Sequence, residues 1–274
     1  MRKIYKNYIY LISIFVLISC AFIYFNPFYK EVAMKDDKDI TIKDNKRFTL
    51  EDANIYYENG KHKKALKIYN KIQTKRQLDV PTLLRKGICE RKLLSYNKAI
   101  NTFTLAKKSA ESNKKNEYSK EIKWIYMNLG ISYFETGDYD KAIKHLEKYK
   151  KKENNSAFIQ LSSSYLLNSY FEAMEYDKCI KEVDYLLELK KDHDKDYLVF
   201  LYETKLDCYL KKENYDKAFT INEKLKEIEP DKLKHYLGTA LIYNSTKGYE
   251  YTQKYLQGLR KKFPNNKKLE SFID

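Results

Sequence analysis

The residues that most often carry out chemistry are few in this chain and are not arranged for it. The chain of 274 residues contains four cysteines and four histidines. These side chains act as metal ligands or nucleophiles when they stand at short, defined spacings. No histidine belongs to an HExxH sequence, and none stands at a metal-ligand spacing from a cysteine. The histidines are His62, His145, His193 and His235.

Motifs of other enzyme classes are also missing from the sequence. It contains no GxSxG sequence of a serine hydrolase and no GxxxxGK[ST] loop for a nucleotide phosphate. Cys89, Cys179 and Cys208 are predicted to be core residues, because buried cysteine behaves as a small hydrophobe. An exported protein could join such cysteines in a disulfide, but these three fall in different units of the repeat described below. The sequence therefore predicts a protein that is not an enzyme and holds no metal or cofactor.

The composition favours a helical fold with a charged surface. Only seven glycines and four prolines are present, which disfavours a β-structure rich in turns. The net charge is +15, and the first 30 residues contribute four basic and no acidic side chains to it. In the remainder, basic and acidic residues alternate along the chain and are not gathered with aromatic residues on one face. This pattern favours solvated helices over a nucleic-acid interface.

A pattern of helix, tight turn and helix recurs along the chain. It is clearest in NLGISYFETGDYDKAIKHLEKY, residues 128–149. Gly137 is predicted to end the first helix in a left-handed conformation, and Asp138 to cap the second. Gly130 and Ala142 are small residues at which the two helices can cross closely. A glycine inside a helix costs about 1 kcal/mol relative to alanine, so close packing is the expected reason for Gly130.

The same pattern can be aligned six times between residues 46 and 266. Successive copies are 34, 43, 37, 39 and 34 residues apart, and we expect longer helix ends or a loop at the widest spacing. Not every copy keeps the pattern. Glu90 replaces a tyrosine in the second copy, and Leu167 replaces a small residue in the fourth. The small residues used for the alignment are Ala65, Ala99, Ala142, Cys179, Ala218 and Thr252.

This pattern resembles the tetratricopeptide repeat family. The resemblance implies an all-α fold, a right-handed α-solenoid of about six helix-turn-helix repeats whose first helices line a concave groove. In such a stack each hairpin buries its apolar face only against its neighbours. We expect the solenoid over residues 46–266 and a short cap over residues 267–274. Because this cap contains few apolar residues, self-association through the C-terminal end is an alternative.

The resemblance also implies which side chains face the groove. They stand near the second, fifth, ninth, twelfth and thirteenth positions of each first helix. The resulting set is apolar and aromatic in the middle with charges at its edges, including Glu135 and Glu172, which suits an amphipathic helix or an extended peptide. The alternative is that some of these side chains only pack between first helices. The candidates are Leu84, Ile88, Arg91, Lys92, Trp124, Met127, Ile131, Phe134, Phe171 and Phe200.

These residues predict a scaffold that binds another molecule without transforming it. Some members of the family hold the terminal carboxylate of a peptide with Lys, Arg and Asn at set groove positions. Only Asn54 matches that set, so the resemblance does not imply this mode here. We expect a protein or peptide partner. A homo-oligomer is an alternative, and nucleic acid or another anionic polymer is the least favoured partner.

The first 28 residues are predicted to attach the chain to a membrane. An uncharged run of 18 residues extends from Tyr8 to Phe25. As a helix it would span about 27 Å, close to the hydrocarbon thickness of a bilayer. The basic residues before it favour a cytoplasmic N-terminus, so the repeat domain is expected on the outer side of the cell membrane. Residues 29–45 would then form a polar linker.

Two other interpretations of this segment stay open. The sequence LISC, which ends at Cys20, resembles a bacterial lipobox, in which the cysteine becomes acylated. Against that interpretation, the apolar sequence AFIYF follows the cysteine. A cleaved signal peptide would need a short apolar stretch followed by small residues, and here the apolar run continues past any such site. All three interpretations place the repeats on the outer side of the membrane or beyond it.

Overall fold

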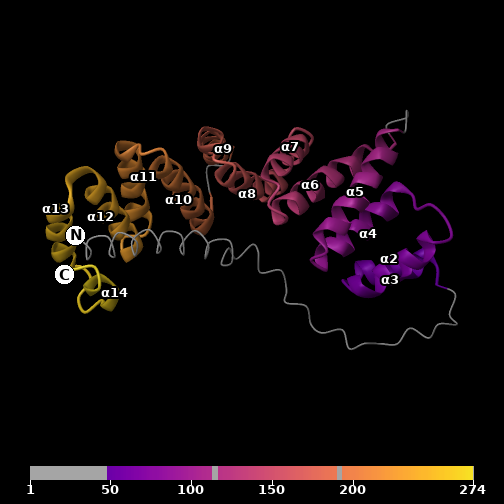
Figure 1. The fold of residues 1–274 in the computed structure, drawn as a ribbon, viewed down its shortest axis with the longest axis horizontal. Helices are drawn as coiled ribbons and strands as arrows, with labels where there is room; N and C mark the ends of the chain where they lie inside the picture. The colour runs from indigo at the N-terminus through magenta and orange to yellow at the C-terminus, as the bar shows by residue number, and fades with distance from the viewer. Residues whose placement is uncertain (1–47, 113–116, 190–192, 274) are drawn as a thin grey trace. The chain divides into compact units, whose positions relative to one another are not determined.

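The described part of the chain is helical throughout. The computed structural model describes residues 48–112, 117–189 and 193–273, and no strand occurs among them. The twelve helices α2 to α13 form six hairpins, and a short helix α14 follows (Figure 1). This confirms an all-α fold of stacked hairpins for these residues. The helices are α2 (Leu50–Glu58), α3 (His62–Gln73), α4 (Val80–Lys92), α5 (Tyr96–Glu111), α6 (Ser119–Glu135), α7 (Tyr139–Lys150), α8 (Ser156–Glu172), α9 (Tyr176–Leu189), α10 (Lys195–Lys211), α11 (Tyr215–Ile228), α12 (Leu233–Lys247), α13 (Tyr249–Leu259) and α14 (Lys267–Glu270).

The predicted membrane segment lies outside the described residues. It covers Tyr8 to Phe25 and includes Cys20, so the structure does not test its interpretation. Every described residue belongs to one compact unit, which covers Arg47–Asp274. No helix in this described portion is long and apolar enough to cross a membrane.

Neighbouring hairpins pack against each other in chain order. From α2 to α13, each helix contacts the helix before it and the helix after it. The first helices of consecutive hairpins also contact each other, from α2 through α4 and α6 to α8. Among the described helices, no comparable contact joins consecutive second helices. The first helices therefore approach each other while the second helices spread apart, and α2, α4, α6 and α8 line the inner face of the stack.

The turn inside a hairpin places one residue in the left-handed backbone region. Gly137 has a φ of +79°, as predicted, and Asp138 accepts a hydrogen bond from the first turn of α7 and so caps that helix. Leu94, Met174 and Glu213 occupy the equivalent position in other hairpins, with φ values of 58°, 59° and 54°. A side chain in this conformation costs roughly 1–2 kcal/mol. Those three hairpins therefore fold around a less favourable turn.

Glycines let the two helices of a hairpin cross closely. A Cβ atom at Gly130 would lie 2.5 Å from Cγ of Leu146, and one at Gly87 would lie 2.4 Å from the Phe103 ring. Both distances are far shorter than a van der Waals contact between carbon atoms. The predicted reason for the glycine inside α6 is therefore confirmed. The side chain that leaves no room for a Cβ atom at Gly130 is that of Leu146, which lies one turn beyond Ala142 in α7.

Glu90, which replaces a tyrosine of the repeat, is buried as one half of an ion pair. Its Oε1 atom lies 2.9 Å from Nζ of Lys86, one turn earlier in α4. The same ammonium group is 3.4 Å from the hydroxyl of Thr102 in α5. A buried charge is costly unless it is paired, so Lys86 is the residue that makes Glu90 tolerable in this core.

The widest spacing between repeats is accommodated mainly by longer helices. Helix α5 continues for 16 residues to Glu111, and α6 begins at Ser119. The hydroxyl of Tyr126 in α6 donates a hydrogen bond to Glu111 Oε1 at 3.1 Å. This bond ties the extended end of α5 to the next hairpin.

A short C-terminal segment covers the last hairpin. Leu269 of α14 and Ile273 after it are buried against apolar residues of α12 and α13. An ion pair between Arg260 and Glu270 holds this segment to the end of α13, with a shortest distance of 2.6 Å between Nη2 and Oε2. The expected cap therefore covers apolar side chains of the sixth hairpin despite its small size.

We expect Gly130→Ala to lower the free energy of unfolding by about 1–3 kcal/mol, because the added methyl group overlaps Leu146. Gly258→Ala in α13 is the matched control, since no neighbouring atom lies within 4 Å of a Cβ there. This control should gain up to about 1 kcal/mol from the higher helix propensity of alanine. Urea unfolding followed by circular dichroism measures both variants. Two substitutions of equal effect would contradict the crossing argument.

Candidate functional site

The candidate metal ligands of the described residues do not come together in one site. Within that part of the chain, no group of three or more His, Cys, Asp or Glu residues could hold a metal ion. The histidine His145 lies between aromatic rings, and His235 Nε2 lies 2.8 Å from Glu229 Oε2. Both histidines are buried, so their surroundings are those of packing residues. The surface of the first helices is therefore the candidate site.

The ten candidate groove residues lie on first helices, but they differ in how far they reach the surface. Leu84, Met127, Ile131 and Phe200 are buried, with at most 9% of their surface exposed. Side chains buried to this degree mainly hold the helices of the stack together. The partly exposed candidates are Ile88, Arg91, Lys92, Trp124, Phe134 and Phe171.

Aromatic rings join α6 to α8 on the inner face. The ring of Trp124 meets that of Phe158 edge-on at a centroid distance of 5.1 Å, and Phe134 meets Tyr165 at 5.7 Å. Leu161 stands three residues after Phe158 and four before Tyr165, so the three share one face of α8. Phe158 and Leu161 keep 40% and 38% of their surface exposed. We call Trp124, Phe134, Phe158, Leu161 and Tyr165 the aromatic strip.

Phe158 and Leu161 were not among the sequence candidates. Leu161 stands at the second position of the first helix in the fourth repeat. Trp124 holds the same position in the third repeat, so the alignment could have identified Leu161 as a groove residue. Phe158 precedes the expected start of that repeat. It is helical because Asn155 caps α8 by accepting hydrogen bonds from the backbone of Ala157 and Phe158. An Asn immediately before the first residue of a helix is a strong signal that a helix begins there. The repeat pattern alone does not include this signal.

Polar groups border the aromatic strip on the side of α4. Nε of Arg91 donates a hydrogen bond to Oδ1 of Asn128 at 3.0 Å. Nδ2 of Asn128 in turn donates to the backbone carbonyl of Trp124 at 2.8 Å. These bonds fix the guanidinium group beside α6. Next to it along α4, burial lowers the pKa of Lys92.

On the side of α10 the corresponding face is acidic. Phe200 is buried, whereas Glu203 and Asp207 follow it one and two turns later and are partly exposed. Burial and the neighbouring Glu203 carboxylate raise the pKa of Asp207 to about 7. Glu203 Oε1 is paired with Nζ of Lys234 in α12 at 2.7 Å.

Asn54, the one match to a carboxylate clamp, is engaged inside its own hairpin. Its Oδ1 atom accepts a hydrogen bond from the hydroxyl of Tyr69 at 2.7 Å. Tyr69 is fully buried, so this bond satisfies a polar group of the core. The side chain of Asn54 thus has a packing role in this structure.

The comparisons with known proteins agree with this architecture. A family model of the tetratricopeptide repeat matches residues 124–156. The solved structure of MamA AMB-1 has a TM-score of 0.53 and 15% sequence identity, and the match covers 66% of this chain and 96% of that one. YrrB, described as a TPR protein with an unusual peptide-binding site, has a TM-score of 0.51 and 13% identity, covering 73% and 94%. No curated protein sequence matches the chain.

The fold and these matches define the class of the protein. The hairpins, their close crossings and their chain-order stacking are those of a helical repeat solenoid. The family model matches one repeat, formed by α6, α7 and the turn that follows them, and the structural likeness shows the same kind of helical fold.

His145 of α7 is held in its neutral form by its surroundings. Its ring stacks on Tyr133 at a centroid distance of 5.5 Å and on Tyr126 at 5.9 Å. Its Nδ1 atom is buried and has no hydrogen-bond partner among the described residues. Burial and three nearby lysines lower the pKa of His145 to about 4. Protonation of this ring is therefore linked to unfolding.

We expect the free energy of unfolding to fall as the pH decreases from about 6.5 to 4. Over this interval the unfolded chain binds a proton at His145 that the native chain does not bind, so acid favours unfolding. The contribution of His145 is roughly 2–3 kcal/mol across the interval. Denaturant unfolding of the wild type and of His145→Gln over this pH range measures it. The variant should show a shallower slope, and identical slopes would refute the assignment.

Proposed function

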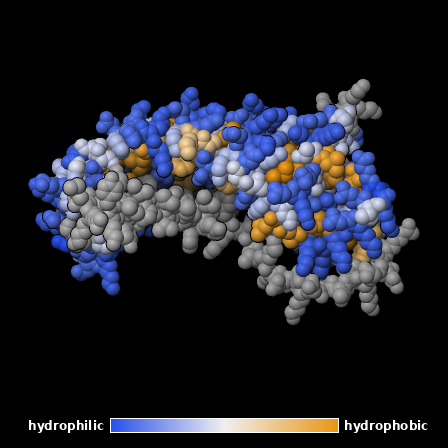
Figure 2. Space-filling model, viewed as in Figure 1, coloured by the Kyte–Doolittle hydropathy of each residue, from blue (hydrophilic) through white to orange (hydrophobic). Residues whose placement is uncertain are grey.

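We propose that the protein is a non-catalytic scaffold that binds a peptide, or a segment of a partner protein, on the inner face of its first helices. The carrying observation is the exposure of Phe158 and Leu161 beside the Trp124 ring, at 40% and 38%. Rigid aromatic side chains that stay accessible on a packed surface are typical anchors for a protein partner. Figure 2 shows hydrophobic side chains reaching the surface over the region of α4 to α6.

The surroundings of the aromatic strip define the chemistry of the ligand. An amphipathic helix or an extended segment with bulky apolar side chains fits the strip, because edge-on rings leave flat apolar surface between them. Arg91 of α4 is hydrogen-bonded to Asn128 of α6 beside the strip, and the next first helix after α8, α10, carries Glu203 and Asp207. A ligand with apolar anchors and polar flanks would suit these neighbours. The likeness of the fold to YrrB, itself described as having a peptide-binding site, supports this proposal.

We further propose that the scaffold is held on the outer side of a membrane by the segment from Tyr8 to Phe25. Support comes from the sequence, in which 18 uncharged residues follow three basic ones. Acylation of Cys20 is the alternative form of attachment. In both cases the polar residues 29–45 would connect the attachment to the first hairpin. A partner bound on the strip would then be kept near the membrane surface.

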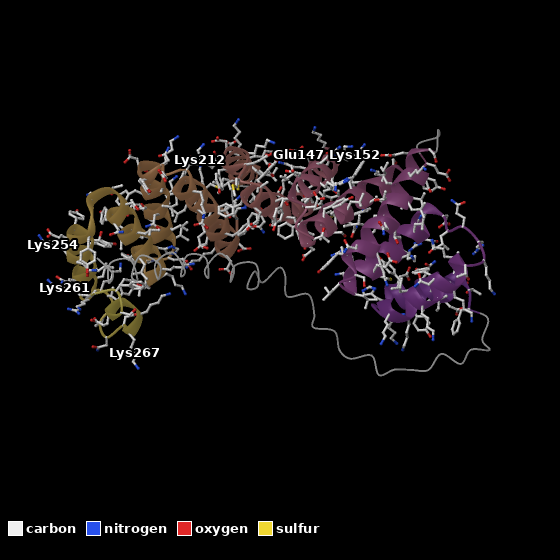
Figure 3. The ribbon with its side chains drawn as sticks, in the orientation of Figure 1. Glu147, Lys152, Lys212, Lys254, Lys261 and Lys267 are labelled. Carbon is white, nitrogen blue, oxygen red and sulfur yellow. The ribbon has the colours of Figure 1, made fainter. Side chains whose placement is uncertain are left out.

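A second candidate function is the binding of an anionic polymer, and the C-terminal end supports it. Lys254, Lys261 and Lys267 point outward from α13, from the turn after it and from α14 (Figure 3). Binding through such lysines releases counterions, so it weakens steeply as salt is added. Binding to the aromatic strip depends mainly on apolar contacts and changes far less. Titration of a captured partner with salt therefore separates the two candidates.

We expect Phe158→Ala combined with Leu161→Ala to weaken partner binding tenfold or more, because anchor residues at a binding surface are typically worth about 1–2 kcal/mol each. The two side chains are partly exposed, so the fold should persist, as circular dichroism can verify. Tyr251→Ala is the matched control, an aromatic side chain 44% exposed on the second helix α13. Crosslinking in native membranes followed by mass spectrometry identifies and quantifies the partner. Unchanged recovery with the double variant would reject the strip as the binding surface.

Substitutions in the N-terminal segment should distinguish a spanning helix from a lipid anchor. With a spanning helix, Cys20→Ala remains in the membrane fraction after alkaline extraction. Ile14→Lys, near the middle of the run, should release much of the protein, because a lysine at the centre of a span costs about 2.5–3.5 kcal/mol. Release by Cys20→Ala, together with loss of labelled fatty acid, would instead establish acylation.

A further inference from the structure

A buried carboxylate lies in the segment that joins the third hairpin to the fourth. Glu153 stands between α7 and α8, and only 7% of its surface is exposed. Its Oε2 atom lies 2.9 Å from Nζ of Lys123 in α6 and accepts a hydrogen bond from the hydroxyl of Tyr149 in α7, also at 2.9 Å. Its Oε1 atom accepts hydrogen bonds from the backbone N–H groups of Asn154 at 3.0 Å and Asn155 at 2.9 Å. One side chain therefore joins α6, α7 and the residues that lead into α8.

The two side chains that bind Oε2 of Glu153 also lie against the Trp124 ring. The ring of Tyr149 is 5.8 Å from that of Trp124, measured between centroids. Nζ of Lys123 lies 5.4 Å from the centroid of the same ring. The carboxylate thus fixes a ring and an ammonium group that together hold the Trp124 side chain in place.

The two N–H groups that bind Oε1 stand where α8 begins. Asn155 caps this helix, and Phe158 lies in its first turn. The Phe158 ring meets that of Trp124 edge-on at 5.1 Å. Through Asn154 and Asn155, Glu153 therefore also fixes the start of the helix that carries Phe158. Its two oxygen atoms act on the two sides of one aromatic contact.

The charge of Glu153 is needed for all of these bonds. Burial by itself raises the pKa of a carboxyl group, but hydrogen bonds from Lys123, Asn155, Tyr149 and Asn154 lower the pKa of Glu153 to about 2. A carboxylate accepts at both oxygen atoms, whereas a glutamine of the same shape has one oxygen and two N–H donors. Glutamine can therefore serve the two backbone N–H groups, or Lys123 and Tyr149, but not both pairs.

We propose that Glu153 is a positioning residue for the aromatic strip, which holds Trp124 and Phe158 in the arrangement that a partner recognises. This inference rests on the function proposed above. Because Glu153 is buried, it acts through the two rings and not by contact with the partner. A surface that is already held in its bound arrangement loses less entropy when the partner binds. Loss of the carboxylate should therefore weaken binding although no contact residue has changed.

The first test needs no partner, because Trp124 is the only tryptophan of the chain and its fluorescence reports on the strip. It uses full-length Glu153→Gln, which must leave one pair of donors without an acceptor. If Lys123 and Tyr149 lose theirs, acrylamide should quench Trp124 more strongly than in the wild type. If Asn154 and Asn155 lose theirs, their backbone amides should exchange hydrogen roughly tenfold faster, as for a lost hydrogen bond to a charged group. Wild-type values of both quenching and exchange would overturn the proposal.

Glu182→Gln is the matched control. Glu182 is a carboxylate buried to the same degree, at 8%, and its partners Lys150 and Ser163 lie outside the aromatic strip. This control should also be less stable than the wild type, but it should leave the quenching of Trp124 and the exchange of the two amides unchanged. Circular dichroism verifies that both variants fold. Equal changes in the two variants would indicate a general loosening of the stack and would overturn the positioning role.

Recovery of the crosslinked partner completes the test and separates this inference from the proposed function. We expect Glu153→Gln to lower recovery roughly tenfold, and Glu182→Gln to leave it near the wild-type value. If Phe158→Ala with Leu161→Ala leaves recovery unchanged, the strip is not the binding surface and the proposed function itself fails. If that double variant lowers recovery but Glu153→Gln does not, the proposed function stands and the positioning role is overturned.

Discussion

The rest of the structure depends on how closely the two helices of one hairpin approach each other. At Gly87 and Gly130 the helix backbone meets Phe103 and Leu146 with no room for a Cβ atom. A hairpin packed this tightly still exposes apolar side chains on its other sides, and only the neighbouring hairpins can cover them. Because the first helices from α2 to α8 also contact one another, those helices form one continuous inner face. Within that face, Phe158 and Leu161 of the aromatic strip keep 40% and 38% of their surface exposed.

Charged residues inside the stack fix how successive hairpins meet. Glu182 of α9 is buried, and its Oε1 accepts hydrogen bonds from Ser163 in α8 at 2.7 Å and from Lys150 in α7 at 2.7 Å. This carboxylate therefore ties three consecutive helices together. Within α4, Glu90 Oε1 is paired with Nζ of Lys86. Such pairs add less to stability than apolar packing does, but a misplaced hairpin would leave a buried charge without its partner.

Much of the fold could be predicted from the sequence, because its signals are local. Gly137 and Asp138 set the turn of the third hairpin through backbone preferences that act over a few residues, and Gly130 marks a helix crossing. The candidate site could be predicted less well, because exposure depends on which neighbour covers each side chain. Met127 stands at a groove position and is buried, whereas Phe158 precedes the expected repeat and is exposed.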